Sequence, residues 1–122
     1  MDKIYLSGME FYGYHGVYPE EKKLGQRYIA DVVLEVNTLF AGKTDALEKT
    51  IDYGKVYLVV ENVMTGKAVN LVETLTETVA ERILETFDIV QAVTVKVTKP
   101  NPPIPGHYQS VAVEIRRERR SE

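Results

Sequence analysis

Residues 28–37 alternate apolar and polar side chains with a period of two, the pattern of a β-strand that has one face in a core and one in water. The apolar positions are Tyr28, Ala30, Val32, Leu34 and Val36. Polar side chains occupy the other face at Asp31, Glu35 and Asn37. Any fold of this chain must therefore supply a sheet with one buried face around this segment.

Residues 3–11 form a second strand pattern near the N-terminus. Ile4 and Leu6 lie on one face, Gly8 interrupts the alternation, and Met9 and Phe11 follow with the parity changed. We expect a β-bulge at this glycine. The stretch between the two strands, residues 12–26, is predicted to be a turn-rich excursion because it contains several glycines and a proline.

Two further strand patterns lie near the C-terminus, over residues 93–99 and 111–116. In the first, Lys99 has the parity of the valines, so its stem is expected to start on the apolar side. The connector Pro100–His107 holds four of the five prolines in the chain. Proline restricts the backbone, so this loop is predicted to be stiff.

The middle of the chain is predicted to form two helices. Asp52 can cap the first, which ends at Gly66. Its apolar residues recur at helical spacing at Val56, Val59, Val60, Val63 and Met64, although so many β-branched residues leave a strand as the competing interpretation. The second helix is expected to have Asn70 as its N-cap and Glu73 as the partner in a capping box. Its apolar stripe is Leu71, Leu75, Val79, Ile83 and Phe87.

The predicted order is β-β-α-α-β-β, an α+β fold with a four-stranded antiparallel sheet and both helices on one face. The other face is too charged for a core and suggests solvent or a water-filled channel. Its charged residues are Asp31, Glu35, Lys96, Glu114 and Arg116. The sheet also has two open edges, which oligomerisation would cover. A ring of subunits would satisfy both features.

Length and composition narrow the class of protein. A chain of 122 residues is expected to be a single domain, residues 1–122, and its net charge of −3 makes nucleic acid a poor partner. There is no cysteine, no apolar run of the ~20 residues that a membrane span needs, and no signal-peptide core, so a cytoplasmic location is the default expectation. The basic run Arg116, Arg117, Arg119 and Arg120 is interpreted as a solvated strand end and tail.

Four stretches of the chain resemble dihydroneopterin aldolases: residues 8–16 (GMEFYGYHG), 52–54 (DYG), 67–73 (KAVNLVE) and 99–107 (KPNPPIPGH). They occur in the family's order over nearly the whole chain. The resemblance implies the tunnelling fold, or T-fold, in which the strands of a tetrameric ring form an oligomeric barrel. It also implies that two rings stack as a homo-octamer and that active sites lie between neighbouring subunits.

The resemblance implies a lyase of folate (tetrahydrofolate) biosynthesis. Its retro-aldol reaction would convert 7,8-dihydroneopterin into 6-hydroxymethyl-7,8-dihydropterin and glycolaldehyde, with epimerisation to 7,8-dihydromonapterin as an isomerase side activity. The dihydropterin carries its own electron sink, the N5=C6 imine, so neither a cofactor, a metal nor a lysine Schiff base is expected. Two alternatives stay open: dihydroneopterin-triphosphate epimerase, which has the same fold, and a ring that binds pterin without catalysis.

Lys99, Tyr53 and Glu21 are the predicted catalytic residues. The resemblance makes Lys99 the general acid/base, acting through a bound water near the pterin N5, and its partial desolvation would favour the neutral form. It places the Tyr53 hydroxyl in a neighbouring subunit's site as a proton relay. It gives Glu21 the task of holding the catalytic water, with the adjacent Glu20 as the competing assignment.

Glu73 and Val72 are predicted to bind the substrate, together with Tyr53 and Glu21. A carboxylate at a helix N-terminus stays ionised, so Glu73 can accept two parallel hydrogen bonds from the 2-amino and N3–H edge of the pterin. Val72 would contribute a backbone group beside it. The two histidines, His15 and His107, cannot complete a usual zinc site without cysteine or carboxylates, and we expect them to order their loops.

Overall fold

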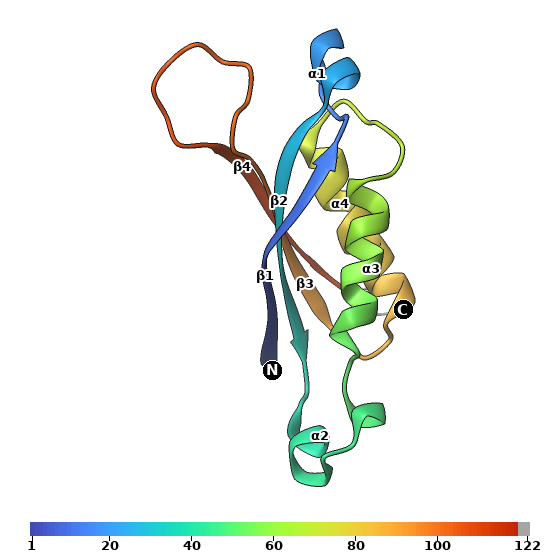
Figure 1. Cartoon of the computed structure of the whole chain (residues 1–122). Coiled ribbons are helices and arrows are strands. Elements are labelled where there is room, and N and C mark those ends of the chain that lie inside the picture. The colour runs from blue at the N-terminus through green and yellow to red at the C-terminus, as the bar shows by residue number, and fades with distance from the viewer. Residues whose placement is uncertain (120–122) are drawn as a thin grey trace.

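The computed structural model of the chain describes residues 1–119 and contains one antiparallel sheet with the strand order β1-β2-β3-β4 (Figure 1). Its strands are β1 (Asp2–Gly13), β2 (Gln26–Val36), β3 (Ala92–Lys99) and β4 (Val111–Glu118). Two long helices, α3 (Tyr53–Met64) and α4 (Val72–Thr86), cover one face. The predicted four-stranded sheet with two helices on one face is therefore confirmed.

The core lies between the helices and the apolar face of the sheet. The alternating residues of β2 from Tyr28 to Val36 are almost completely buried, as are Val93, Val95 and Val97 of β3. Val60 of α3 and Ile83 of α4 meet them from the helical side. The burial alternates residue by residue along β2, as the sequence pattern predicts.

The irregularity of β1 falls at Gly8, as predicted. The register with β2 shifts between Leu6 and Met9, and Gly8 adopts a positive φ of 67°. Its N–H donates to the Asp31 carboxylate at 2.7 Å. Because the bulge changes the parity, Met9 and Phe11 face the core beyond it.

One of the two predicted helix caps is correct and the other is wrong. The Asp52 side chain accepts a hydrogen bond from the N–H of Gly54 at 3.0 Å at the start of α3. At α4, however, the N-cap is Leu71, which has no side chain able to cap. Asn70 instead accepts a hydrogen bond from Lys22, and Glu73 is the second residue of the helix. The expected capping box of Asn70 and Glu73 does not form.

Three short helical segments were not predicted: α1 (Pro19–Leu24), α2 (Leu39–Thr44) and the 3-10 turn η1 (Leu47–Lys49). Each is too short for an apolar stripe to repeat, so hydrophobic periodicity cannot reveal it. Pro19 at the first helical position is the one local signal for α1. This segment was interpreted as part of a turn-rich excursion, and it proves to carry a site residue.

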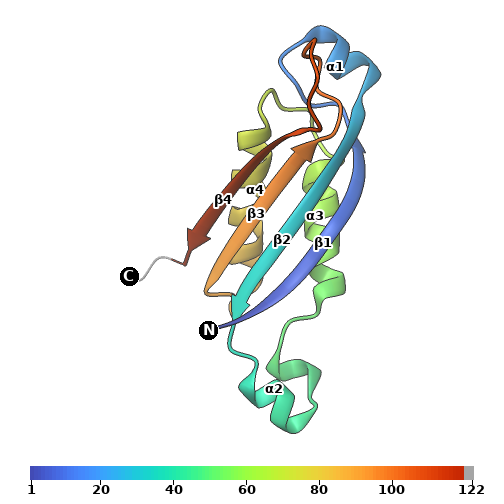
Figure 2. The same ribbon diagram turned by 90° about the vertical axis from the view of Figure 1, so that its left-hand side faces the viewer.

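The helix-free face of the sheet is charged, as expected, and faces the viewer in Figure 2. Asp31, Lys96 and Glu114 are neighbours across three strands, and Arg116 pairs with Glu35 at 2.8 Å. Strands β1 and β4 form the two edges. Within residues 1–119, no helix is long and apolar enough to cross a membrane.

The basic run begins at the exposed end of β4, as expected of a solvated strand end, but it makes more contacts than expected. Arg117 pairs with Glu77 of α4. Arg119 donates to the carbonyl oxygens of Leu84, Phe87 and Val90 at 2.8–3.0 Å, around the C-terminal end of α4. The Leu84 carbonyl belongs to the last turn, whose carbonyls lack partners within the helix, and a cation there also suits the helix dipole. Arg120 lies outside the described residues.

Candidate active site

Lys99 is the last residue of β3, and its side chain points to the helical side of the sheet. Its stem follows the buried face of the strand and is only 13% exposed. Its Nζ lies 2.7 Å from a carboxylate oxygen of Glu21. The strand parity predicted this orientation, because Lys99 continues the row of Val93, Val95 and Val97.

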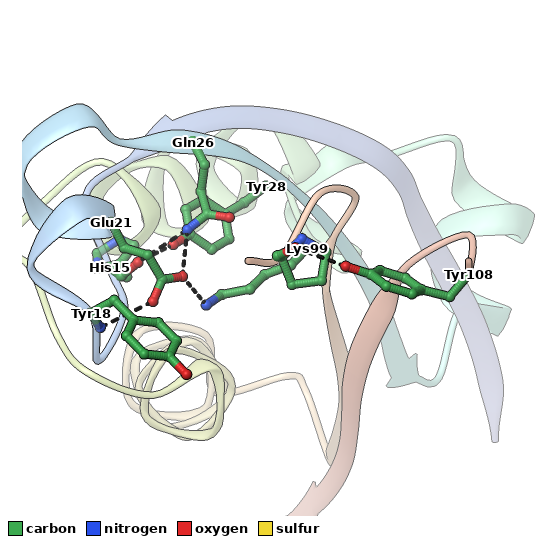
Figure 3. Close-up of polar contacts among 8 residues, drawn as sticks. His15, Tyr18, Glu21, Gln26, Tyr28, Lys99 and Tyr108 are labelled. Atoms are coloured by element: carbon green, nitrogen blue, oxygen red, sulfur yellow. Dashed lines mark hydrogen bonds and ion pairs between the residues drawn. The ribbon is translucent and has the colours of Figure 1, made fainter. Parts of the chain in front are cut away.

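Glu21 lies in α1 and is buried, with its carboxylate held from three sides (Figure 3). The ammonium of Lys99 donates at 2.7 Å, the Gln26 side-chain amide at 2.8 Å and the Tyr18 backbone N–H at 3.2 Å. Burial alone would raise the pKa of Glu21, but these hydrogen bonds outweigh it and lower the pKa below its ordinary value. The neighbouring Glu20 is exposed.

Lys99 has a partner that the sequence interpretation did not consider. Its nitrogen lies 2.7 Å from the buried carboxylate of Glu21, which is an ion-pair distance. The two residues therefore form one unit that can exchange a proton with a bound molecule. The neutral form expected from desolvation stays a prediction.

Gln26 contacts Glu21 in the site but was not among the site residues predicted from the sequence. It is the first residue of β2 and shares the parity of Tyr28 and Ala30, which face the core. That parity is the signal that could have identified it. Its amide also approaches the carbonyl oxygen of His15 at 3.4 Å, so it links Glu21 to the loop between β1 and α1.

The close approach of that loop to Glu21 requires a glycine at position 16. Gly16 has φ +149°, a backbone conformation that side chains disfavour. A Cβ atom added there would lie 2.3 Å from the carboxyl carbon of Glu21. Gly16, the last residue of the stretch 8–16, thus makes room for the buried carboxylate.

A depression of about 370 Å³ opens next to the Lys99–Glu21 pair. The start of α4 supplies one wall, including Val72 and Glu73. The proline loop supplies another with Pro102, Pro103 and Ile104. Four of the five predicted site residues, Lys99, Glu21, Glu73 and Val72, thus meet around one hollow.

Tyr53 is the predicted site residue that this chain does not bring to the hollow. It begins α3, directly after the connection from α2, and is 66% exposed. In Figure 1 that end of α3 lies toward α2, whereas α1 and the proline loop lie at the opposite end of the molecule. Within one chain, Tyr53 and Lys99 therefore do not share a site.

His15 orders its loop, as predicted. Its Nε2 lies 2.7 Å from the Met64 carbonyl oxygen, and its Nδ1 accepts the Val69 N–H at 3.1 Å. Tyr28 packs edge-on against the ring, and its hydroxyl donates to the His15 carbonyl oxygen at 2.5 Å. Burial, together with the negative charge of Glu21, raises the pKa of Tyr28 to about 12. His107 lies in the exposed part of the proline loop, and its role stays a prediction.

The family model described as dihydroneopterin aldolase matches residues 4–116. The chain belongs to the dihydroneopterin aldolase family. A Bacillus subtilis dihydroneopterin aldolase is 56% identical over 119 residues, which cover 98% of this chain and 99% of that protein.

Two solved structures of dihydroneopterin aldolases are similar to this one. The E. coli enzyme in complex with neopterin superimposes with a TM-score of 0.88 at 26% identity, over 96% of this chain and 99% of that one. A Burkholderia enzyme bound to guanine gives a TM-score of 0.79 at 28% identity, over 98% and 92%. This dihydroneopterin aldolase family member therefore has the tunnelling fold that the sequence resemblance implied.

The two sides of the hollow differ in their charged groups and in their exposure to solvent. On one side this family member has a buried pair, Lys99 and Glu21, that can donate and accept protons. On the other it has the Glu73 carboxylate, in the first turn of α4 and exposed to solvent. The hollow therefore combines an exposed carboxylate on one wall with a buried ion pair on another.

Proposed function

We propose that this chain is a cytoplasmic dihydroneopterin aldolase that cleaves 7,8-dihydroneopterin into 6-hydroxymethyl-7,8-dihydropterin and glycolaldehyde in folate biosynthesis. Family membership supports the reaction class. One observation carries the proposal: the buried Lys99–Glu21 pair and the Val72–Glu73 edge line the same hollow. A ring-binding edge and a proton-handling pair at one site are what this reaction requires of the protein.

Glu73 is proposed to recognise the pterin ring. Its carboxylate can accept two parallel hydrogen bonds from the 2-amino group and the adjacent ring N–H. It lies in the first turn of α4, where the helix dipole interacts favourably with a carboxylate, and Val72 offers a backbone group beside it. The similar proteins support this assignment, since one was solved with neopterin and another with guanine, and both molecules carry an amino group next to a ring N–H.

Lys99 and Glu21 are proposed to move the protons of the retro-aldol step. The 2′-hydroxyl loses its proton, the C1′–C2′ bond breaks, and glycolaldehyde forms. The bonding electrons move to C1′ and into the N5=C6 imine of the substrate, which gives an enamine. A proton then adds to C1′ and the imine is restored. The buried ammonium of Lys99 can stabilise the charge that develops near N5, and Glu21 can hold the water that carries the proton.

The same intermediate accounts for a proposed epimerase activity. If glycolaldehyde rotates and presents the other face of its carbonyl to C1′ of the enamine before it leaves, the configuration at C2′ is inverted and the side chain becomes that of 7,8-dihydromonapterin. This step needs no additional residue, because it is the cleavage run in reverse. The balance between the two outcomes depends on how fast glycolaldehyde leaves the hollow.

Tyr53 is proposed to complete the site from a second chain. It is exposed and remote from Lys99 in its own subunit, and the open edges of β1 and β4 allow further subunits to extend the sheet. A ring of four chains would turn the charged face of each sheet toward a central channel. Two such rings would form the proposed octamer.

The test is an assay of the purified protein with 7,8-dihydroneopterin, in which the pterin product and glycolaldehyde are both identified. We expect equal amounts of the two, together with some dihydromonapterin. The triphosphate of dihydroneopterin is assayed in parallel. Epimerisation of the triphosphate without glycolaldehyde release from dihydroneopterin would contradict the proposal in favour of the epimerase. Neopterin binding without turnover of either compound would indicate a non-catalytic ring.

A further inference from the structure

His15 lies between the two functional sides of the hollow although it does not line it. Only 1% of the residue is exposed, so its ring cannot touch a bound substrate. The ring contacts two backbone groups that precede α4: the carbonyl oxygen of Met64 at 2.7 Å and the N–H of Val69 at 3.1 Å. The loop between these two residues and α4 leads directly to Val72 and Glu73.

The hydrogen bonds determine the protonation state that the ring must have. A backbone N–H can only donate, so Nδ1 must carry a lone pair to accept from Val69. A backbone carbonyl can only accept, so Nε2 must carry the hydrogen that is shared with Met64. The structure therefore requires a neutral imidazole with its proton on Nε2.

The backbone of the same residue faces the other side of the hollow. The His15 carbonyl oxygen accepts from the Tyr28 hydroxyl at 2.5 Å and approaches the Gln26 amide at 3.4 Å. Gln26 in turn holds the Glu21 carboxylate. The next residue, Gly16, donates its N–H to the Val69 carbonyl oxygen at 2.9 Å, which ties the two loops together a second time.

We propose that His15 is a positioning residue that, as a neutral imidazole, sets the Val72–Glu73 edge at a fixed place relative to the Lys99–Glu21 pair. This inference rests on the proposed function, because it assigns the Val72–Glu73 edge to pterin recognition. A substitution that removes the imidazole removes the hydrogen bonds that hold the loop before the Val72–Glu73 edge. The backbone contacts on the side of the Lys99–Glu21 pair remain, because these come from the carbonyl group of residue 15.

Gly13 indicates that the contact of His15 with the Met64 carbonyl is specific and that the ring does not simply fill space in the core. A Cβ atom at Gly13 would lie 2.8 Å from the Met64 carbonyl oxygen and 2.9 Å from Cδ2 of His15. The end of β1 can therefore approach the end of α3 only because residue 13 has no side chain. That approach is what brings the Met64 carbonyl within hydrogen-bond distance of the ring.

Protonation of His15 would break this arrangement. Burial and the positive charge of Lys99 lower the pKa of His15, although the Met64 carbonyl opposes them. Lys99 is the charged group whose field reaches the ring. The other neighbours are uncharged: Tyr28 packs edge-on as a neutral phenol, and Met64 and Val69 contribute backbone groups. An imidazolium would point a second N–H at the Val69 N–H. The recognition edge should therefore loosen when the ring is protonated, below pH 6.5.

The experiment compares His15→Phe and His15→Gln with Ile83→Ala as a control for lost stability. Phe keeps the ring volume but removes both hydrogen bonds, whereas the Gln amide can supply a donor and an acceptor. Ile83 is buried in α4, about 16 Å along the helix from Val72. We measure kcat and KM for dihydroneopterin and the dissociation constant of neopterin.

For His15→Phe we expect KM and the neopterin dissociation constant to rise about tenfold, since ~1.4 kcal/mol of binding is lost, with a smaller fall in kcat. His15→Gln should recover part of this loss, and Ile83→Ala should show neither change. A fall in kcat at unchanged KM, or an effect no larger than that of Ile83→Ala, would overturn the proposal. If the wild type releases no glycolaldehyde, the proposed function fails, yet the neopterin constants still test the positioning role.

Nitrogen NMR of the wild-type protein covers the case in which His15→Phe does not fold. We expect a buried imidazole protonated on Nε2 at pH 7, and neopterin affinity that declines as this ring titrates. A ring that carries its proton on Nδ1 at pH 7, or affinity that stays constant while the ring titrates, would overturn the proposal.

Discussion

The ammonium of Lys99 lies 2.7 Å from the carboxylate of Glu21, although the first belongs to the end of β3 and the second to the short helix α1. Both side chains are largely withdrawn from water, which strengthens their interaction and makes each sensitive to the loss of the other. The pair is the part of the proposed site that one chain completes by itself.

Replacement of Lys99 by alanine should reduce kcat by about 10²–10⁴-fold, the usual range for a lost general acid or base. Pterin binding should remain largely intact, because the residues proposed to recognise the ring, Glu73 and Val72, line the other wall of the hollow. The measurement is turnover of dihydroneopterin alongside neopterin binding. Lys96→Ala is the matched control, since Lys96 lies on the same strand but is exposed on the opposite face. Near-normal turnover in Lys99→Ala would refute the assigned role.

Glu21 should make the stability of the protein depend on pH in acid. Its pKa in the folded protein is below the ordinary value of 4.5, so its ionisation stabilises the fold fully above pH 4.5. This contribution is lost as the pH falls through the folded-state pKa. Glu21→Gln cannot ionise, so the difference in urea midpoint between wild type and variant should be largest above pH 4.5 and narrow below it. Midpoints are compared at one protein concentration.

The control for that experiment is Glu20→Gln, which removes a charge from the adjacent, exposed position. Its midpoint should follow the wild type at every pH, because an exposed carboxylate without a buried partner contributes little. A gap between wild type and Glu21→Gln that stays constant down to pH 3 would show that the loss is one of packing. Glu20→Gln should also keep its turnover, which would settle the assignment between the two glutamates.

Tyr53 and Lys99 should complement each other between chains. Tyr53→Phe and Lys99→Ala are each expected to be nearly inactive as pure proteins. When they are unfolded together in equal amounts and refolded into mixed rings, up to about one site in four should combine an intact Tyr53 with an intact Lys99. The activity of the mixture should therefore exceed the sum of its parts. If both residues came from one chain, no mixed ring could contain an intact site, and the activity would stay at that sum.

Much of the fold follows from local pattern. The period-two alternation of residues 28–37 identified the central strand and its buried face, and the broken parity at Gly8 located the bulge. Both signals depend only on which side chains of one segment face the core and which face water. The start of α4 could not be found in this way, because Asn70 turns to Lys22 of α1 and the cap falls on Leu71. A long-range contact decides that boundary.

The same distinction separates the site residues. Lys99 could be oriented from the parity of its own strand, whereas the pairing of Glu21 with Lys99 depends on α1, a helix too short to show periodicity. The contacts of the arginines at the end of the chain were also not predicted, because they join residues that are distant in the sequence. Nothing in the run itself indicates that Arg119 meets the carbonyls at the end of α4, since those carbonyls become neighbours only in the folded chain.

Tyr108 holds the proline loop in the shape that forms one wall of the hollow. Its hydroxyl lies 2.9 Å from the Pro102 carbonyl oxygen and 2.5 Å from that of Ile104. The single hydroxyl proton is therefore shared between two carbonyl groups of the loop. Four prolines limit the backbone of this loop, and most of its residues are exposed. Tyr108→Phe removes the hydroxyl and keeps the ring.

This substitution should raise KM for dihydroneopterin several-fold, as expected for the loss of a hydrogen bond with a net value of about 1 kcal/mol. The fall in kcat should be smaller, because Lys99 precedes the loop and is held by Glu21. Tyr57→Phe on α3 serves as the control for the removal of a tyrosine hydroxyl elsewhere. An unchanged KM in Tyr108→Phe would show that the prolines alone shape the wall. An equal loss in kcat and kcat/KM would instead mean that the loop contributes to the transition state rather than to binding.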